Sequence, residues 1–422
     1  MLIKDGLIMD PDSGLEEKGD LRISDGIITE IASNLSAEAG EEVISAKGLV
    51  VAPGLIDVHT HFRDPGFTHK EDIITGANAA MAGGYTTVIM MCNTSPAIDN
   101  TDTLTECLKK GRHTGIHVES CAAVTKGLKG EKLTDMDRLI SAGAIGFTDD
   151  GIPLMDEELL TQAMIKCASR NVPISLHEEN RELISENGIN HGAASEFYQI
   201  NGSPREAEIT LIERDLEIAL KTNAILNIQH ISTKEGVELV RRAKRVPGNR
   251  IHAEVTPQHL NLTEEAVIEM GSLAKLNPPF RTETDRQALI AGVKDGTIDL
   301  IATDHAPHTK EEKDKPIVNA PSGMIGLETA LPLACEALIN EGGQKLIDVL
   351  KLLTVNPAKM YHLDRGRIAK GKVADVIVYD PNEEWVVSSF RSKSSNSPFI
   401  GRTLKGRVKM TICAGKMIYK VE

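Results

Sequence analysis

The chain of 422 residues is longer than most single compact domains, so we expect one large domain and one smaller one. Its formal net charge of −14 and the lack of a Lys/Arg-rich stripe exclude a nucleic-acid partner. The six cysteines are scattered and no apolar stretch reaches about 18 residues, which excludes a disulfide framework, a thiolate zinc site and a membrane span and predicts a cytoplasmic protein.

The two ends of the chain share one sequence pattern. Residues 1–50 and 365–422 contain short alternating apolar runs separated by glycine turns, for example LRISDGIITEIA, KVADVIVYDP and RVKMTICAGKMIY. Alternation with a period of two is typical of half-buried strands. We therefore predict that both ends combine into one small β-sandwich domain.

Residues 51–364 carry a different pattern, in which short β-branched runs alternate with longer helical segments. The runs are LIDVH, YTTVIMM, GIHVESCA, AIGFT, VPISLH, AILNIQHIS, IHAEV and IDLIATD. Eight strand-helix units in succession predict an α/β fold of the (β/α)8 barrel type, and an open doubly wound sheet is the weaker alternative.

Polar side chains gather where these predicted strands end. The residues concerned are His59, His61, Asn93, Asp149, Asp150, His177, His230 and Asp304. Strand ends of a parallel barrel meet at one face, so the four histidines with two carboxylates, Asp304 and one of the adjacent Asp149 and Asp150, predict a metal centre. Six ligands exceed what one tetrahedral zinc takes, which favours two divalent ions that share a bridging carboxylate and activate a water.

Two neighbouring acids compete for the bridging position. Asp149 and Asp150 both follow the fourth strand, and position alone does not choose between them. Helix capping is the alternative role for Asp149, although Asp156 is better placed to cap the helix that follows. Downstream, residues 305–323 after the eighth strand have little helical or strand signal, and a loop of that length predicts a functional lid.

A set of specific motifs spans nearly the whole chain. They are DVHTHFRDPG, CNTSP, FTDDG, SLHEEN, IQHIST, LNPPFR, ATDHAPHT, SGMIGLETALP and GRIAKGKVADVIVYDP. Together they resemble the bacterial class I dihydroorotases of the amidohydrolase superfamily. This resemblance implies two zinc ions per chain. One would be held by His59, His61 and Asp304, the other by His177 and His230, and Asp150 would bridge them.

The resemblance also implies the reaction and the substrate contacts. The reaction is the reversible cyclisation of N-carbamoyl-L-aspartate to L-dihydroorotate in pyrimidine biosynthesis, with a metal-bound hydroxide as nucleophile and Asp304 as general acid and base. The implied substrate contacts are Arg63, Asn93 and Asn277 on the carboxylate and His308 on the ring. A homodimer and an association with aspartate transcarbamoylase are further possibilities.

The chain departs from the expected motifs at three positions. Asp64 stands where Glu is expected, Cys92 where Pro is usual, and Glu178 where a small residue or Cys is commoner. None of these changes removes an implied ligand, but Glu178 could alter the surroundings of His177.

Two alternative functions remain for the same fold. Dihydropyrimidinases, hydantoinases and allantoinases are related cyclic amidases that use a carboxylated lysine as the bridge, and no lysine ends the fourth strand here. Some dihydroorotase-like chains are instead non-catalytic partners of aspartate transcarbamoylase. Such chains are expected to lack part of the metal set, whereas all six implied ligands are present.

Overall fold

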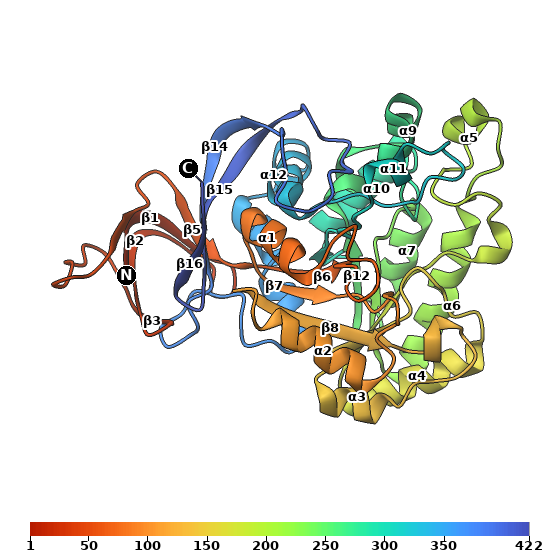
Figure 1. The fold of residues 1–422 in the computed structure, drawn as a ribbon, viewed down its shortest axis with the longest axis horizontal. Helices are drawn as coiled ribbons and strands as arrows, with labels where there is room; N and C mark the ends of the chain where they lie inside the picture. The colour runs from red at the N-terminus through yellow and green to blue at the C-terminus, as the bar shows by residue number, and fades with distance from the viewer. Residues whose placement is uncertain (422) are drawn as a thin grey trace.

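The computed structural model describes residues 1–421, which form a parallel barrel with a second sheet beside it (Figure 1). The barrel strands are β6 (Leu55–Thr60), β7 (Tyr85–Met90), β8 (His117–Ala123), β9 (Gly146–Thr148), β10 (Pro173–Leu176), β11 (Ile225–Ile228), β12 (Ile251–Val255) and β13 (Leu300–Ile301). They follow one another in chain order around the sheet, and a bridge between Thr60 and His305 joins the first strand to the last. The predicted (β/α)8 barrel is confirmed.

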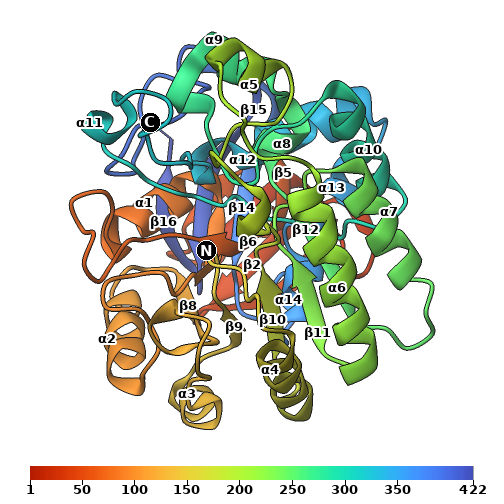
Figure 2. The ribbon, with the colours of Figure 1, turned by 90° about the vertical axis from the view of Figure 1, so that its right-hand side faces the viewer.

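Helices alternate with the strands and surround them (Figure 2). In the first half of the chain they are α1 (Ile73–Gly83), α2 (Thr101–Gly111), α3 (Met136–Ala142), α4 (Glu157–Arg170), α5 (Ala193–Tyr198) and α6 (Glu206–Thr222). In the second half they are α7 (Lys234–Ala243), α8 (Pro257–Asn261), α9 (Glu265–Met270), α10 (Glu283–Lys294), α11 (Lys310–Lys313), α12 (Ala330–Cys335), α13 (Leu346–Leu352) and α14 (Val355–Met360).

Helix α4 illustrates how the sequence produces this layer. Asp156 caps its first turn by accepting a hydrogen bond from the Leu159 amide, which confirms the predicted cap. Leu160, Met164 and Cys167 follow at helical spacing, and all three are buried against the strands. Burial of one such side chain contributes roughly 1.5–3 kcal/mol, which fixes the helix to the barrel.

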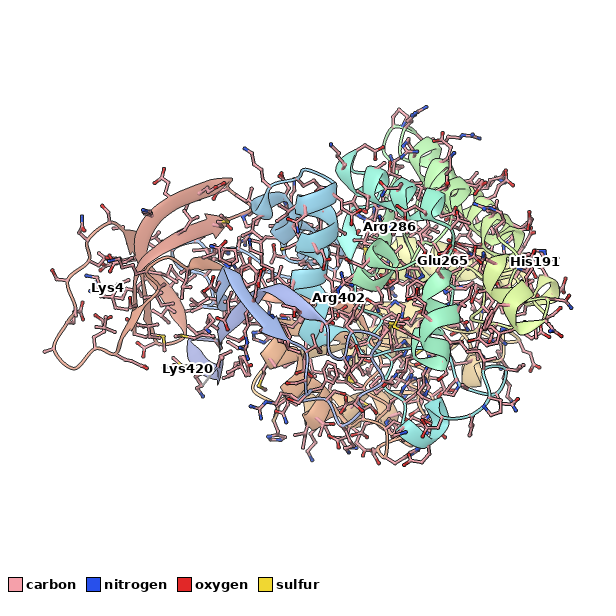
Figure 3. The ribbon with its side chains drawn as sticks, turned by 90° about the horizontal axis from the view of Figure 1, so that it is seen from above. Lys4, His191, Glu265, Arg286, Arg402 and Lys420 are labelled. Carbon is pink, nitrogen blue, oxygen red and sulfur yellow. The ribbon has the colours of Figure 1, made fainter. Side chains whose placement is uncertain are left out.

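Both chain ends enter the second sheet, as the sequence predicts. Its strands are β1 (Leu2–Asp10), β2 (Leu15–Ser24), β3 (Ile27–Ala32), β4 (Val43–Ser45), β5 (Val50–Pro53), β14 (Val376–Val386), β15 (Thr403–Cys413) and β16 (Lys416–Lys420). Strand β5 joins the two ends because it pairs with β1 on one side and with β14 on the other. Figure 3 shows Lys4 and Lys420 at this end of the molecule and His191 at the opposite end.

The layers of this terminal domain belong to one continuous sheet that curls on itself. A bridge between Ile27 and Val373 connects the start of β3 to the residues before β14. The curl encloses a separate apolar core that includes Ile8, Leu21 and Val378. No helix in residues 1–421 is long and apolar enough to cross a membrane.

Candidate metal centre and active site

Six polar residues meet at the carboxyl ends of the barrel strands. His59 lies on β6 and His61 directly after it, while Asp150, His177, His230 and Asp304 follow β9, β10, β11 and β13. All six side chains are buried, which is unusual for groups that carry or accept charge. The barrel therefore brings together the residues that the sequence analysis selected as ligands.

The Asp150 carboxylate occupies the middle of this group. Its Oδ1 atom lies 3.4 Å from His59 Nε2, 3.7 Å from His177 Nδ1 and 3.8 Å from His230 Nε2, while its Oδ2 atom lies 3.4 Å from His61 Nε2. The residues thus form two sets that share Asp150, one with His59 and His61 and one with His177 and His230. Asp304 adjoins the first set, with its Oδ1 atom 3.0 Å from His61 Nε2.

Three of the histidines are oriented by an acceptor on the far side of the ring. His59 Nδ1 lies 2.5 Å from Glu254, His61 Nδ1 lies 2.9 Å from the Asn93 amide oxygen, and His177 Nε2 lies 2.9 Å from Glu179. Each acceptor accepts a hydrogen bond from the ring N–H, which leaves the opposite nitrogen with a lone pair directed at the centre. This tautomer is the one that ligates metals.

The centre also contains polar atoms that lack protein partners. Neither His59 Nε2 nor Asp150 Oδ1 makes a hydrogen bond within residues 1–421, although both are buried. His177 Nδ1 and His230 Nε2 lie 2.9 Å apart, a distance at which two lone pairs repel unless a proton or cation is shared. Unpaired buried acceptors of nitrogen and carboxylate type fit two divalent cations.

Electrostatics around the centre favour positive charge. Burial lowers the pKa of His59, but the Glu254 and Asp150 carboxylates outweigh it and raise that pKa well above its ordinary value. Burial raises the pKa of Asp304, yet His59 and His61 bring it below its usual range. A cation can satisfy this concentration of acceptors in place of protons.

The backbone is strained at three site residues. Arg63, His230 and Asp304 have φ angles of +59°, +33° and +47°, a region that non-glycine residues rarely adopt. Such conformations cost about 1–3 kcal/mol each and occur where surrounding structure imposes them. All three residues line the pocket beside the centre, so the strain accompanies the aiming of their side chains.

The carboxylates of Asp149 and Asp150 contact different residues. The Asp149 carboxylate accepts hydrogen bonds from the backbone amides of Val124 and Thr125 and from the Thr125 hydroxyl, so it clamps the turn after β8. Burial raises the pKa of Asp149 to about 7. The helix-capping alternative for Asp149 is therefore wrong, and only Asp150 reaches the histidines.

A cavity of about 190 Å³ opens directly above the centre. It is lined by His61, Arg63, Asn93, Asp150, Gly151, His177, His230, Asn277, Asp304, Ala306, His308, Ser322 and Gly323. Every residue that the resemblance assigned to substrate binding is in this lining. Asn93 has a second role, because its amide oxygen accepts from His61 and its amide nitrogen donates to Asp150.

Residues 305–323 cover one side of this cavity, in agreement with the loop position predicted from the sequence. His308 Nε2 lies 2.9 Å from the Ser322 carbonyl oxygen, and its Nδ1 lies 3.4 Å from Lys70 Nζ. Burial, together with the charges of Arg63 and Lys70, lowers the pKa of His308, so the ring is neutral at physiological pH. Short helix α11 within the loop is an element that the sequence analysis did not predict.

The three motif departures do not reach the cavity lining. Asp64 forms an ion pair of 2.7 Å with Lys110, and the Cys92 thiol donates to the Thr148 carbonyl. Glu178 is buried beside Asp215, whose charge adds to burial in raising the pKa of Glu178. Glu178 therefore changes the packing behind His177 without entering the site.

Sequence reasoning missed the groups that orient the ligands. Glu254 lies on β12 and is fully buried, and Glu179 follows His177 by two residues. A signal for Glu254 does exist, because it is an acid inside the otherwise apolar end of the run IHAEV. Its partner His59 is 195 residues away, and no local pattern connects the two.

Known proteins of the same length resemble this chain. A model of the amidohydrolase family matches residues 50–418. A dihydroorotase of Clostridioides difficile is 48% identical over 419 residues, with 99% of each chain covered, and one of Lactococcus lactis is 48% identical over 423 residues, with 100% of each covered. An L-hydantoinase (dihydropyrimidinase) structure from Arthrobacter aurescens superposes with a TM-score of 0.88 at 25% identity, covering 99% of this chain and 96% of that one.

Proposed function

This chain belongs to the dihydroorotases of the amidohydrolase family, and we propose that its strand-end site interconverts N-carbamoyl-L-aspartate and L-dihydroorotate. It is thus a cyclic amide hydrolase, and in the biosynthetic direction it closes the ring of a pyrimidine precursor. The hydantoinase-like structures share the barrel with this chain, so the choice between the two substrate classes depends on the pocket.

Arg63 is the residue that favours one substrate class over the other. Its guanidinium lines the cavity, and among residues 1–421 it has only a carbonyl oxygen and an imidazole within hydrogen-bonding distance and no carboxylate as an ion-pair partner. A partly buried cation without a counter-ion favours an anionic group on the ligand. Dihydroorotate carries a ring carboxylate, whereas dihydrouracil does not. The buried Asn277 Oδ1, which also lacks a partner, offers a further polar contact.

We assign two divalent cations as cofactors and expect them to be zinc. His59, His61 and Asp304 would hold one, His177 and His230 the other, and Asp150 would contact both. When bound, this pair supplies an activated water and polarises the amide carbonyl. The buried, unpaired His59 Nε2 and Asp150 Oδ1 support the assignment.

Proton transfer is the task of Asp304. In ring opening, a water oxygen adds to the amide carbon, Asp304 takes the proton from that oxygen, and the C–N bond breaks as Asp304 delivers the proton to the ring nitrogen. In ring closure, the carbamoyl nitrogen attacks the side-chain carboxylate carbon, Asp304 carries the nitrogen proton to the departing oxygen, and one further proton from solvent completes the water that leaves. The low pKa of Asp304 keeps it ionised and ready to accept.

Arg63 and His308 position the ring for these transfers. The Arg63 guanidinium binds the substrate carboxylate, while the neutral imidazole of His308 packs beside the ring without a competing positive charge. Fixed donors and a small cavity hold the reacting atoms in the productive geometry, which lowers the activation barrier. Ring closure is tested by incubating the purified chain with N-carbamoyl-L-aspartate and following dihydroorotate. A protein with both metals that forms none would contradict the proposal.

Metal analysis should find about two divalent ions per chain, because the two residue sets share one carboxylate. His230→Ala removes a ligand of only one set and should lower the content to about one ion. Elemental analysis after dialysis measures both values. Full activity of the wild-type chain with a single ion would refute the two-ion assignment.

The two neighbouring acids should respond differently to amide substitution. Asp150→Asn weakens the shared ligand and should lower turnover by about 10²-fold or more. Asp149→Asn keeps an oxygen for the Val124 and Thr125 amides, so it should affect turnover far less. Steady-state kinetics at saturating metal compare them. If Asp149→Asn were the more damaging change, the bridging role would belong to Asp149.

Two predictions concern the assembly of the chain. They are a homodimer and an association with aspartate transcarbamoylase, which size-exclusion chromatography with and without the transcarbamoylase would test. A complete ligand set favours a catalytic chain over a non-catalytic partner.

A further inference from the structure

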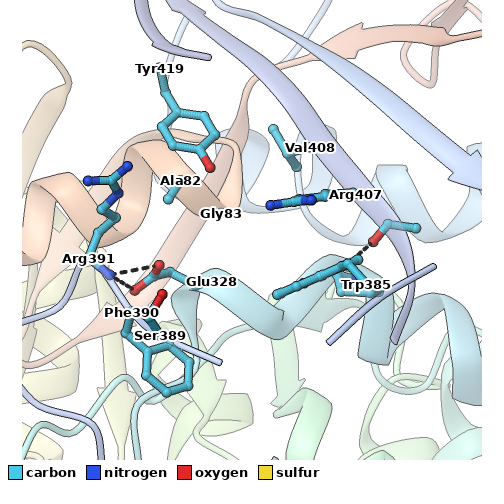
Figure 4. A pocket seen from close by; sticks show the side chains of 12 residues that line it. Ala82, Gly83, Glu328, Trp385, Ser389, Phe390, Arg391, Arg407, Val408 and Tyr419 are labelled. Carbon is cyan, nitrogen blue, oxygen red and sulfur yellow. Dashed lines mark hydrogen bonds between the residues drawn. The ribbon is translucent and has the colours of Figure 1, made fainter. Parts of the chain in front are cut away.

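The connection between β14 and β15, residues 387–402, leaves the terminal sheet and reaches the barrel (Figure 1). The half-buried Glu328 and the buried Glu71 anchor it there. Glu328 accepts hydrogen bonds of 2.8 and 2.9 Å from the Arg391 amide, drawn in Figure 4, and Glu71 accepts one of 3.1 Å from the Lys393 amide. The segment is therefore held against the barrel before it reaches Asn396.

Asn396 joins both ends of the loop that covers the active-site cavity. Its side chain is 4% exposed, and its Nδ2 atom donates to the Ala306 carbonyl at 3.0 Å and to the Gly323 carbonyl at 3.2 Å. Its Oδ1 atom accepts from the His308 amide at 3.0 Å. One amide group, 73 to 90 residues away in the chain, thus satisfies three backbone groups of the loop.

The interior of the loop is already tied together by two buried lysines. Lys313 Nζ donates to the carbonyls of Pro321 and Gly323, both at 2.9 Å. Lys275 Nζ donates to the Ile317 and Ala320 carbonyls, both at 2.8 Å. Lys313 thus already holds the Gly323 end of the loop, and a backbone hydrogen bond from Ala306 to Met324 joins the two ends. Asn396 adds the side-chain contacts that connect Gly323 to Ala306 and His308.

The ends of the loop carry the groups that face the substrate. His308 lies at the first end, where the Pro307 carbonyl also accepts a hydrogen bond of 3.3 Å from Arg63 Nε. Gly323 lies at the other end and lines the same cavity. A shift of either end would displace the imidazole and loosen the contact of the guanidinium with Pro307.

We propose that Asn396 is a positioning residue of this enzyme, through which the terminal β domain sets the geometry of the substrate pocket. The inference rests on the proposed function, since it assumes that Arg63 and His308 contact the substrate. Asparagine suits the task because it offers one acceptor and two donors from a planar group. A misplacement of about 1 Å in such groups can lower the rate by about 10²-fold.

Asn396→Ala and Asn396→Asp test the proposal in the metal-loaded protein, with Ser395→Ala as the control. Ser395 is the exposed neighbour, and no hydrogen bond of its side chain is found in residues 1–421. Metal content and hydrogen exchange of residues 305–323 are measured first, because neither requires activity. Steady-state kinetics with dihydroorotate follow.

We expect Asn396→Ala to keep both metals, to exchange faster in residues 305–323 and to lower kcat/KM by about 10²-fold, with the larger share in KM. Asn396→Asp places a carboxylate against two carbonyls. Its kcat/KM at alkaline pH should therefore be lower than that of Asn396→Ala. Its deficit relative to the wild type should shrink toward acid pH, where protonation restores one donor. The Ser395→Ala control should match the wild type.

Three results would overturn the proposal. They are unchanged exchange of the loop, a kcat/KM within about threefold of the wild type, or a loss of metal that accounts for the loss of rate. A wild-type chain without dihydroorotase activity would instead reject the proposed function. In that case faster hydrogen exchange of residues 305–323 in Asn396→Ala would still show that Asn396 holds the loop. Unchanged exchange would reject that role.

Discussion

Asp304→Asn should lower the turnover of dihydroorotate by about 10²–10⁴-fold, the range that general acid-base catalysis supplies. The amide has the size of the carboxyl group and can remain beside His61, whose Nε2 lies 3.0 Å from Asp304 Oδ1. It cannot accept the proton that ring opening releases. The defect should therefore lie in kcat, as measured at saturating substrate with metal content determined on the same sample.

Asp299→Asn is the matched control for this change. Asp299 precedes the same strand, β13, at the opposite end of the barrel, where it contacts His252 and Lys244. Its substitution should leave turnover within about threefold of the wild type, because sites this distant act independently. Equal effects of the two substitutions, or a loss in Asp304→Asn explained entirely by missing metal, would remove the proton-transfer role from Asp304.

Arg63→Met should lower kcat/KM for dihydroorotate by about 10²–10⁴-fold, because hydrogen bonds to a charged group contribute about 1.5–3 kcal/mol each and a guanidinium can make two. Methionine retains the apolar stem but no donor. Both metals should remain, since Arg63 belongs to neither ligand set. The measurement is kcat/KM for dihydroorotate and dihydrouracil with each protein, and the gap between the two rings should narrow in the variant.

Arg138→Met, on the exposed face of α3, controls for the loss of a positive charge. This variant should keep the wild-type kcat/KM for dihydroorotate and the wild-type preference for dihydroorotate over dihydrouracil. If Arg63→Met kept the wild-type preference, the substrate carboxylate would be recognised elsewhere, and Asn277 would be the next residue to substitute.

The barrel and the cluster of polar residues at its strand ends could be predicted because their signals are local. Each strand is a short β-branched run, and His59 and His61 keep the two-residue period that places side chains on one face. The competition between Asp149 and Asp150 could not be settled by that period, because β9 ends at Thr148 and a turn then sets both directions. The hydrogen bonds from the Val124 and Thr125 amides hold the Asp149 carboxylate away from the histidines.

The supporting groups could not be predicted because their signals are distant. Glu254 reads as an isolated acid in a strand until the closed barrel brings it to His59. Asn396 lies in a serine-rich stretch that resembles an ordinary surface loop, and only the path of residues 387–402 back to the barrel gives it partners. Packing between remote segments determines such contacts, and no period along the chain records it.

The central claim is that a chain with this barrel recognises a ring by its carboxylate. The most direct test is the ratio of kcat/KM for dihydroorotate to kcat/KM for dihydrouracil, measured on the wild-type protein carrying both metals. A site whose buried polar groups are left unpaired by the wrong ring can discriminate by roughly 10⁴–10⁵, and we predict a ratio of that order in favour of dihydroorotate. Comparable rates for the two rings would contradict the account and would assign the chain to the dihydropyrimidinase side of its family.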